Sequence, residues 1–206
     1  GTSDKSTLIV TINRPQMRNA VDNETAEALA EAFKAFDTDP AYKVALFTGT
    51  GSCFCAGADL NEMASGARRK RWRESPDGPM GPTRLALSKP VIGAIEGYAV
   101  AGGFELALWC DLRIAASNAV FGVFNRRWGV PLIDGGTVRL PRLVGVGRAL
   151  EITMTGRPVP ADEALQIGLV NELTPPSSTL ARARELAATL AALPQDALNL
   201  DRRSIN

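Results

Sequence analysis

The sequence predicts an α/β domain followed by a helical region, and three observations support this prediction. Short apolar stretches alternate with segments of helical periodicity over the first 140 residues. The order strand, glycine-rich turn, helix occurs twice, roughly 45 residues apart, a spacing that fits one repeated supersecondary unit. After residue 140 the pattern is helical. We therefore divide the chain into an α/β core at residues 1–140 and a C-terminal helical region at residues 141–206.

The composition is that of an ordinary globular protein, and it excludes several functional classes. The chain has 206 residues, 45% hydrophobic and 22% charged, and a formal net charge of +1. This charge gives no electrostatic reason to expect a nucleic acid or a membrane as partner. No apolar stretch approaches the length of a membrane span, and no basic-then-apolar leader opens the sequence. The sequence has no histidine, which excludes histidine-based triads and histidine-ligated zinc, and we expect no metal.

The first 83 residues are expected to contain two strands, two helices and a loop. A strand at residues 7–13 is followed by a helix that begins at Asp22. A second strand at residues 44–48 leads into a glycine-rich turn at residues 51–59, and a helix follows the turn. Residues 65–83, rich in Arg, Gly and Pro, are expected to form a long mobile loop. The apolar face of the first helix is formed by Ala26, Leu29, Ala30, Phe33 and Phe36.

The same order returns in the second half of the chain. A strand at residues 91–95, a glycine-rich turn at residues 97–103 and a helix at residues 104–110 repeat the earlier pattern. The remaining expected elements are strands at residues 112–115 and 120–123, and helices at residues 147–155, 161–167 and 178–192.

The two glycine-rich turns carry the clearest chemical signal. Each precedes a helix, whose first backbone N–H groups have no intrahelical partner and lie at the positive end of the helix dipole. Small residues in both turns, 56–58 and 101–103, allow a ligand to approach the backbone closely. Converging turns would form an oxyanion hole worth ~3 kcal/mol per donor. The alternative for either turn alone is that it only lets a helix pack tightly against a strand.

Glu105 lies three residues after Gly102, near the first turn of the second of these helices. A carboxylate there favours the helix dipole, or completes a capping box. The Ser or Thr that a capping box requires is absent, because residues 100–102 are Val, Ala and Gly. A glutamate in an otherwise apolar run is unfavourable unless it is paired or used. We therefore interpret Glu105 as a functional carboxylate.

Several ordered motifs span nearly the whole chain, and together they resemble the crotonase superfamily, the enoyl-CoA hydratases and isomerases. The motifs lie at residues 12–20, 54–60, 89–107, 135–141, 155–157 and 161–171. The resemblance implies a crotonase (ClpP-like) spiral of repeated ββα units. It also implies a helical C-terminal region that supports a trimer or a hexamer, and in this sequence that region is expected to be incomplete.

The resemblance also implies the site. The backbone N–H groups of Ala58 and Gly102 would form the oxyanion hole, and Glu105 would orient or activate the water that adds to an enoyl-CoA double bond. Coenzyme A is expected as part of an acyl-CoA thioester substrate, with no separate cofactor. The coenzyme A contacts would come from Gln16, Met17, Arg18, Ala56, Asp59 and Leu60.

One position departs from the hydratase pattern. Hydratases carry a second glutamate after the Phe-Gly dipeptide, and here Phe121-Gly122 leads to Asn125. Asparagine can hold a water or a carbonyl but cannot exchange a proton near neutral pH. Asp134 is the nearest substitute, and its alternative role is that of a turn residue before two glycines. Glu105, Asn125 and Asp134 are therefore the candidate catalytic residues.

The remaining signals leave alternatives open. The main prediction is a lyase or isomerase that works through a thioester enolate; the alternatives are a double-bond isomerase or epimerase with one carboxylate, and a non-catalytic acyl-CoA-binding homologue.

The basic run at residues 68–73 either attracts coenzyme A phosphates or is a solvated loop. Asp59 is expected to cap a helix. Three cysteines with no favourable pair indicate a reducing, cytoplasmic location, and Cys55 is expected to be a packing residue.

Overall fold

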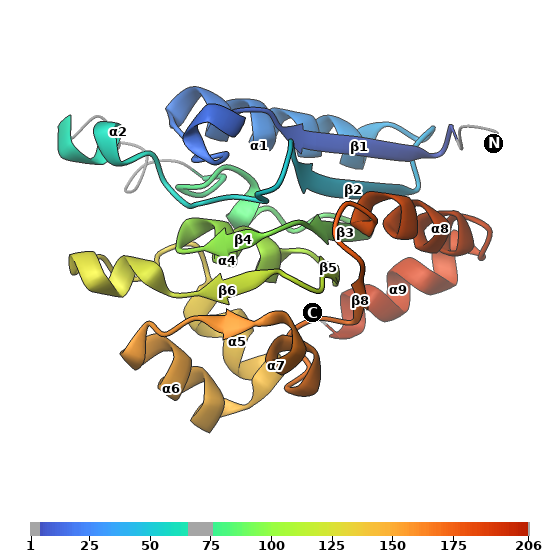
Figure 1. The fold of residues 1–206 in the computed structure, drawn as a ribbon. Helices are drawn as coiled ribbons and strands as arrows, with labels where there is room; N and C mark the ends of the chain where they lie inside the picture. Colours follow the sequence, from blue (N-terminus) through green and yellow to red (C-terminus); the bar gives the residue numbers. More distant parts are fainter. Residues whose placement is uncertain (1–4, 66–75, 206) are drawn as a thin grey trace.

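The fold combines two β-sheets with helices on their outer faces (Figure 1). The structure is a computed structural model that describes residues 5–65 and 76–205. Within these residues the larger sheet has five parallel strands: β1 (Thr7–Ile12), β2 (Val44–Gly49), β3 (Val91–Ile95), β5 (Leu112–Ala116) and β8 (Glu172–Thr174), in that spatial order. The smaller sheet has the order β4 (Tyr98–Val100), β6 (Val120–Gly122), β7 (Val159–Pro160).

Successive strands of the chain alternate between the two sheets. β3 lies in the larger sheet and β4 in the smaller one, and β5 and β6 repeat this division. Helix α4 (Gly102–Trp109) follows the first pair. The first glycine-rich turn joins the same arrangement, because Cys55 forms a parallel bridge with Ala99 of β4. The predicted α/β class and its strand–strand–helix repeat are therefore confirmed.

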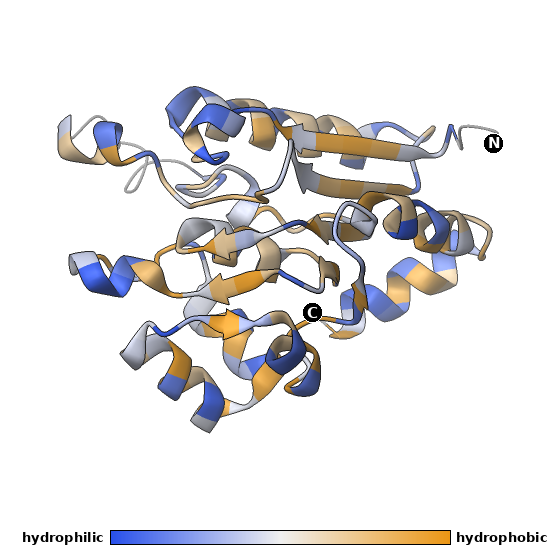
Figure 2. Cartoon of the chain, viewed as in Figure 1, coloured by the Kyte–Doolittle hydropathy of each residue, from blue (hydrophilic) through white to orange (hydrophobic). Residues whose placement is uncertain are grey.

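The larger sheet is covered on both faces, which explains why its central strands β2 and β3 are buried along their whole length. Side chains alternate across a strand. Val44 and Leu46 of β2 therefore pack against α8 (Thr179–Ala191), whereas Ala45 and Phe47 face the main core with α1 (Asn23–Thr38). Figure 2 shows β1 and β2 coloured toward the hydrophobic end along their length. The sheet thus forms the rigid layer from which the turns project.

Helix α1 forms where the sequence predicted it. Asp22 is its N-cap, and the Asp22 carboxylate accepts a hydrogen bond of 2.8 Å from the Thr25 N–H, which satisfies one of the unpaired donors at the helix start. All five residues of the predicted apolar face are buried: Ala26, Leu29, Ala30, Phe33 and Phe36.

The C-terminal region does more than add helices. β7 pairs with β6, and β8 pairs with β5, so residues 141–206 complete both sheets. The expected boundary after residue 140 falls inside α5 (Gly136–Val144). The other helices of this region are α6 (Val146–Thr155), α7 (Ala161–Gln166), α8 and α9 (Gln195–Ile205), and α9 lies where no element was predicted.

Two details of the predicted organisation were wrong. α4 begins at Gly102 rather than Phe104, and residues 98–100 of the predicted turn form β4. Residues 79–83, placed in a mobile loop, are buried, and the short helix η2 (Pro82–Arg84) lies among them. Met80 packs in the main core. The basic run at residues 68–73 lies outside the described residues. None of the described helices is both long enough and apolar enough to cross a membrane.

Candidate active site

A cavity of about 230 Å³ lies where the two glycine-rich turns meet the start of α4. Its wall is largely apolar, and the three candidate catalytic residues Glu105, Asn125 and Asp134 all line it. A mostly apolar cavity with a few convergent polar groups is the usual form of a small-molecule site. The residues of the turns that line it are Ala56, Ala58, Val100, Ala101 and Gly102.

The two turns are in contact, as the oxyanion-hole prediction requires. A methyl group built on Gly57 would lie 3.0 Å from Cβ of Ala101 and 3.2 Å from N of Gly102. Ala101, the N-cap of α4, has φ 53°, a conformation that side-chain-bearing residues adopt rarely. Within the described residues, the N–H groups of Ala58 and Gly102 have no hydrogen-bond partner. Two unpaired donors therefore lie in the wall of one cavity.

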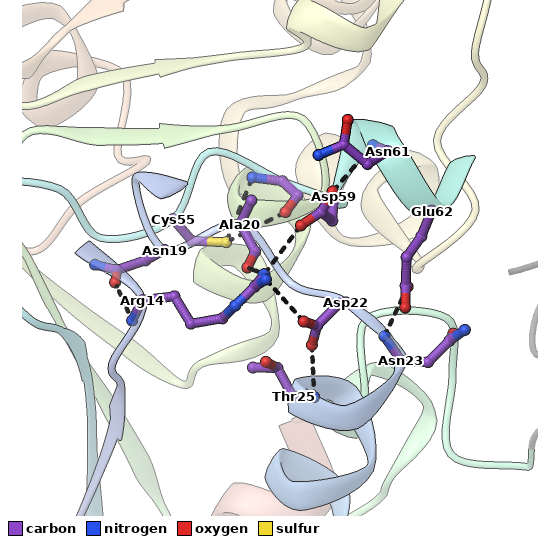
Figure 3. A network of polar contacts seen from close by, with 11 residues as sticks. Arg14, Asn19, Ala20, Asp22, Asn23, Thr25, Cys55, Asp59, Asn61 and Glu62 are labelled. Carbon is purple, nitrogen blue, oxygen red and sulfur yellow. Dashed lines mark hydrogen bonds and ion pairs between the residues drawn. The ribbon is translucent and has the colours of Figure 1, made fainter. Parts of the chain in front are cut away.

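A polar network centred on Arg14 fixes the first turn (Figure 3). The Arg14 guanidinium donates to the Asp22 carboxylate at 2.8 Å and to the Asp59 carboxylate at 3.2 Å. Asn19 is fully buried, and its amide donates to the Cys53 carbonyl at 2.6 Å. These bonds tie the segment after β1 to residues 53–59. The backbone of Ala58 is thus held from the side opposite to α4.

Glu105 is buried, with 2% of its surface exposed, and its carboxylate is held by the backbone. Oε1 accepts hydrogen bonds from the N–H groups of Asp134 at 2.9 Å and Gly136 at 2.8 Å. Gly136 lies close to this carboxylate, since a Cβ built on it would be 2.9 Å from Oε1. These two hydrogen bonds engage Oε1 and not Oε2.

The environment of Glu105 prepares it for proton transfer near neutral pH. Burial is the main reason that the pKa of Glu105 is raised to about 7, and the nearby charge of Asp134 raises it further. The backbone hydrogen bonds from Gly136 and Asp134 oppose the shift because they stabilise the ionised form. A carboxyl group with a pKa of about 7 is suited to act as both base and acid.

Asp134 is buried, and its carboxylate is already engaged. Oδ1 accepts a hydrogen bond of 2.9 Å from the Met80 N–H and another from the Thr83 hydroxyl. Its backbone carbonyl accepts from Nη1 of Arg139 at 2.8 Å. Asp134 therefore lines the cavity while its carboxylate is bonded to η2 and to the segment before it.

Asn125 lies in the short helix η3 (Phe124–Trp128) and presents an acceptor. Its Nδ2 donates to the Val130 carbonyl at 2.8 Å. Its Oδ1 is buried and has no partner among the described residues. An unpaired acceptor in a cavity wall calls for a donor from the ligand, such as a hydroxyl group or a water molecule.

The predicted coenzyme A residues lie along the opening of the first turn. Gln16, Met17 and Arg18 are exposed around the short helix η1 (Pro15–Met17), and the Arg18 carbonyl accepts from the Ala56 N–H at 3.0 Å. The exposed Leu60 begins helix α2 (Leu60–Ser65) and lines the cavity.

Two of the weaker predictions concern buried side chains near this opening. The Asp59 carboxylate accepts from the Asn61 N–H at 3.0 Å at the start of α2, so the capping prediction is confirmed. Cys55 is fully buried in the main core, as expected of a packing residue.

Sequence reasoning missed three residues that contact the candidate catalytic groups: Met80, Thr83 and Arg139. Arg139 carried a usable signal, because it interrupts the apolar pair Val138 and Leu140 in a helical segment next to Asp134. Met80 and Thr83 carried none, since they lie in a Gly- and Pro-rich stretch that is typical of an exposed loop.

Comparisons with known proteins show which family and which solved structures the chain resembles. The family model described as enoyl-CoA hydratase/isomerase matches residues 2–206. A carnitinyl-CoA dehydratase of Salmonella typhi is 42% identical over 191 residues, which cover 89% of this chain and 70% of the relative. A crotonyl-CoA hydratase of Syntrophomonas wolfei is 39% identical over 208 residues, covering 98% and 79%. A crystal structure of an enoyl-CoA hydratase from Mycobacterium tuberculosis H37Rv superposes with a TM-score of 0.92 at 39% identity, covering 98% of this chain and 78% of the other.

Proposed function

The chain belongs to the enoyl-CoA hydratase/isomerase family and has its crotonase fold, and from this premise we propose how this acyl-CoA-acting enzyme divides the chemistry among its residues. The N–H groups of Ala58 and Gly102 bind the thioester oxygen and stabilise the enolate. Glu105 moves the proton at the acyl carbons. Asn125 positions the water or hydroxyl group. The enzyme works through an enolate and requires no separate cofactor.

One observation carries this proposal: the same cavity has two unpaired backbone donors and a buried carboxyl group whose pKa is about 7. Donors fixed by the fold stabilise charge that develops in the transition state without reorganising. The acidity of an acyl-CoA α-hydrogen rises when its enolate oxygen is bound in this way. Glu105, held on Oε1 by two N–H groups, presents Oε2 to the carbon that gains or loses the proton.

In the hydration direction Glu105 is the only residue that accepts and returns a proton. A water molecule attacks the β-carbon of the enoyl thioester, and Glu105 accepts one of its protons. The electron pair of the double bond moves to the thioester oxygen, where the N–H groups of Ala58 and Gly102 hold the enolate. Glu105 then returns the proton to the α-carbon, and the carbonyl re-forms. The second O–H of the water stays intact and donates a hydrogen bond to Asn125 Oδ1 throughout.

Asn125 favours a second function, double-bond isomerisation or epimerisation. Both reactions need one carboxyl group and an enolate but no added water, so they do not require a proton-exchanging residue at position 125. Hydration shares these first steps and adds the attack of water. The balance between the reactions therefore depends on how well Asn125 replaces a carboxyl group.

The proposed function predicts that the wild-type protein exchanges the α-hydrogens of a saturated acyl-CoA with solvent deuterium, and hydrates crotonyl-CoA more slowly than it exchanges. Exchange requires enolate formation, which the oxyanion hole and Glu105 supply together. Mass spectrometry of the recovered thioester measures exchange, and loss of enoyl absorbance measures hydration. Binding without exchange would identify a non-catalytic acyl-CoA-binding protein and overturn the proposal.

The same assays distinguish the role of Asn125. Asn125→Glu should raise the rate of crotonyl-CoA hydration tenfold or more. A tenfold increase requires the new carboxyl group to lower the activation free energy by only ~1.4 kcal/mol. Asn125→Gln is the matched control, because it has the same length and no titratable proton, and its hydration rate should not rise. Equal rates in both variants, or efficient hydration by the wild type, would contradict this role.

We propose that coenzyme A lies along η1 and the start of α2. Exposed Gln16, Met17 and Arg18 are placed to contact its adenine and pantetheine parts, together with the backbone of Ala56 and the side chain of Leu60. The Asp59 carboxylate is held by Arg14 and by its capping bond, so Asp59 contributes through its backbone.

We also propose self-association as a trimer or a hexamer. Val146, Leu150 and Met154 are exposed at four-residue intervals on α6, which places an apolar stripe on one helix face. Leu150→Arg should therefore shift the sedimentation coefficient toward a smaller species. Leu165→Arg, on the exposed surface of α7, is the control and should leave assembly unchanged. A wild-type monomer would contradict the proposal.

A further inference from the structure

A closed set of polar contacts lies next to Glu105 and includes Asp134, whose backbone N–H donates to Glu105 Oε1. Asp134 and Thr83 are buried, and Arg139 of α5 is half-buried. The Thr83 hydroxyl donates to the Asp134 carboxylate. Arg139 donates from Nη1 to the Asp134 carbonyl at 2.8 Å and from Nη2 to the Thr83 carbonyl at 2.6 Å. Each of the three residues is thus bonded to the other two.

This set connects three segments that are distant in sequence. Thr83 belongs to η2, Asp134 to the loop before α5, and Arg139 to α5 itself. The Asp134 N–H donates to Glu105 Oε1, and the Asp134 carboxylate accepts from the Met80 N–H. The Met80 side chain lies against Gly102, since a Cβ on Gly102 would be 2.7 Å from its sulfur. The contacts therefore reach both the proposed proton carrier and the proposed oxyanion donor.

We propose that Thr83, Asp134 and Arg139 form a charged clamp that positions Glu105, with the negative charge of Asp134 and the positive charge of Arg139 acting on it in opposite directions. This inference rests on the proposed role of Glu105. It assigns Asp134 as a positioning residue rather than as a second proton carrier. The reason is that Asp134 contacts Glu105 through its backbone N–H, which donates to Oε1, while its carboxylate accepts hydrogen bonds from the Met80 N–H and the Thr83 hydroxyl.

The opposite charges of Asp134 and Arg139 explain why the two residues have opposite effects on the ionisation of Glu105. The negative charge of Asp134 disfavours ionisation of Glu105, so it contributes to the raised pKa of Glu105 after burial. Burial lowers the pKa of Arg139, and attraction to Glu105 and Asp134 opposes that shift. Because this attraction is mutual, the Arg139 cation favours ionised Glu105. Among the described residues packed near α4, Arg84 and Tyr98 are exposed, and Cys110 has a pKa of about 12 and stays neutral.

Two substitutions test the clamp because they should move the same titration in opposite directions. Asp134→Asn keeps an acceptor for Met80 and Thr83 and removes the charge, so the titration of Glu105 should move down by roughly one pH unit. Arg139→Gln removes the cation, so the titration should move up. The acidic limb of the kcat/KM profile for deuterium exchange measures both shifts. Arg139→Lys keeps the positive charge, so the acidic limb of its kcat/KM profile should lie at the wild-type pH rather than at that of Arg139→Gln.

A second readout does not depend on turnover. The infrared band of a protonated carboxyl group that disappears in Glu105→Gln reports the protonation of Glu105 alone, and its pH titration should show the same opposite shifts. Shifts of one sign in both variants, or no shift with folding intact by circular dichroism, would overturn the clamp. If the carboxyl band shifts as expected while wild-type exchange is absent, the proposed function fails and the clamp stands.

Discussion

Glu105→Gln is expected to reduce turnover by ~10²–10⁴-fold while acyl-CoA affinity stays close to that of the wild type. The glutamine carbonyl oxygen can still accept the N–H groups of Asp134 and Gly136, so the cavity wall keeps its shape. What is lost is the proton exchanged at Oε2. Stopped-flow or deuterium-exchange rates, together with calorimetric titration of a saturated acyl-CoA, measure the two quantities separately.

The pH profile provides the control for this substitution. The pKa of Glu105 is raised to about 7, chiefly by burial. As the base it must be ionised, so wild-type kcat/KM should fall as pH drops below about 7, and this limb should be absent from the residual activity of Glu105→Gln. Glu105→Ala should in addition lower stability by ~1–3 kcal/mol, because two buried N–H groups lose their acceptor. Turnover of Glu105→Gln within about threefold of wild type would remove Glu105 from the mechanism, given the ~10² minimum expected for a lost base.

The local elements of this fold could be predicted because each has a periodic signal of its own. The apolar face of α1 recurs at helical spacing, and all five predicted residues are buried. β2 and β3 are mostly apolar and buried throughout because both faces of the larger sheet are covered. β4 could not be predicted, since three residues next to a glycine-rich turn have no period. Its existence depends on pairing with β6, a long-range contact.

The residues of the candidate site likewise divide into those with a local sequence signal and those that only long-range contacts bring together. Glu105 could be identified because a carboxylate in an apolar run has few structural explanations. The convergence of the two turns required the fold, since long-range contacts such as the bridge between Cys55 and Ala99 bring them together. The same holds for the clamp, whose members Thr83 and Asp134 are 51 residues apart.

Buried Arg113 shows a further limit of sequence reasoning. Its side chain donates to the Cys110 carbonyl at 2.5 Å and to the Leu169 carbonyl at 2.7 Å, which supports the end of α4 opposite to the oxyanion turn. The hydrogen-bond acceptors of this cation are backbone carbonyl groups. Every residue type has such a group, so the sequence alone does not indicate which residues bind Arg113.

Gly102→Pro is expected to lower the rate of exchange by ~10²–10³-fold, because it removes the backbone donor aimed at the thioester oxygen. Gly102 is the first residue of α4, a position at which proline is tolerated because its missing N–H has no intrahelical partner. The loss should therefore fall on the chemical step more than on the helix. Single-turnover exchange rates, with circular dichroism to verify folding, measure it.

Gly102→Ala is the control that separates the lost donor from the added side chain. Both substitutions place a Cβ about 2.7 Å from the Met80 sulfur, so both require the flexible Met80 side chain to move. Only proline removes the N–H. If Gly102→Ala slows exchange as much as Gly102→Pro does, crowding by Met80 accounts for the effect and Gly102 is not an oxyanion donor. If the alanine variant keeps most of the rate, the difference between the two variants measures the contribution of this N–H to enolate stabilisation.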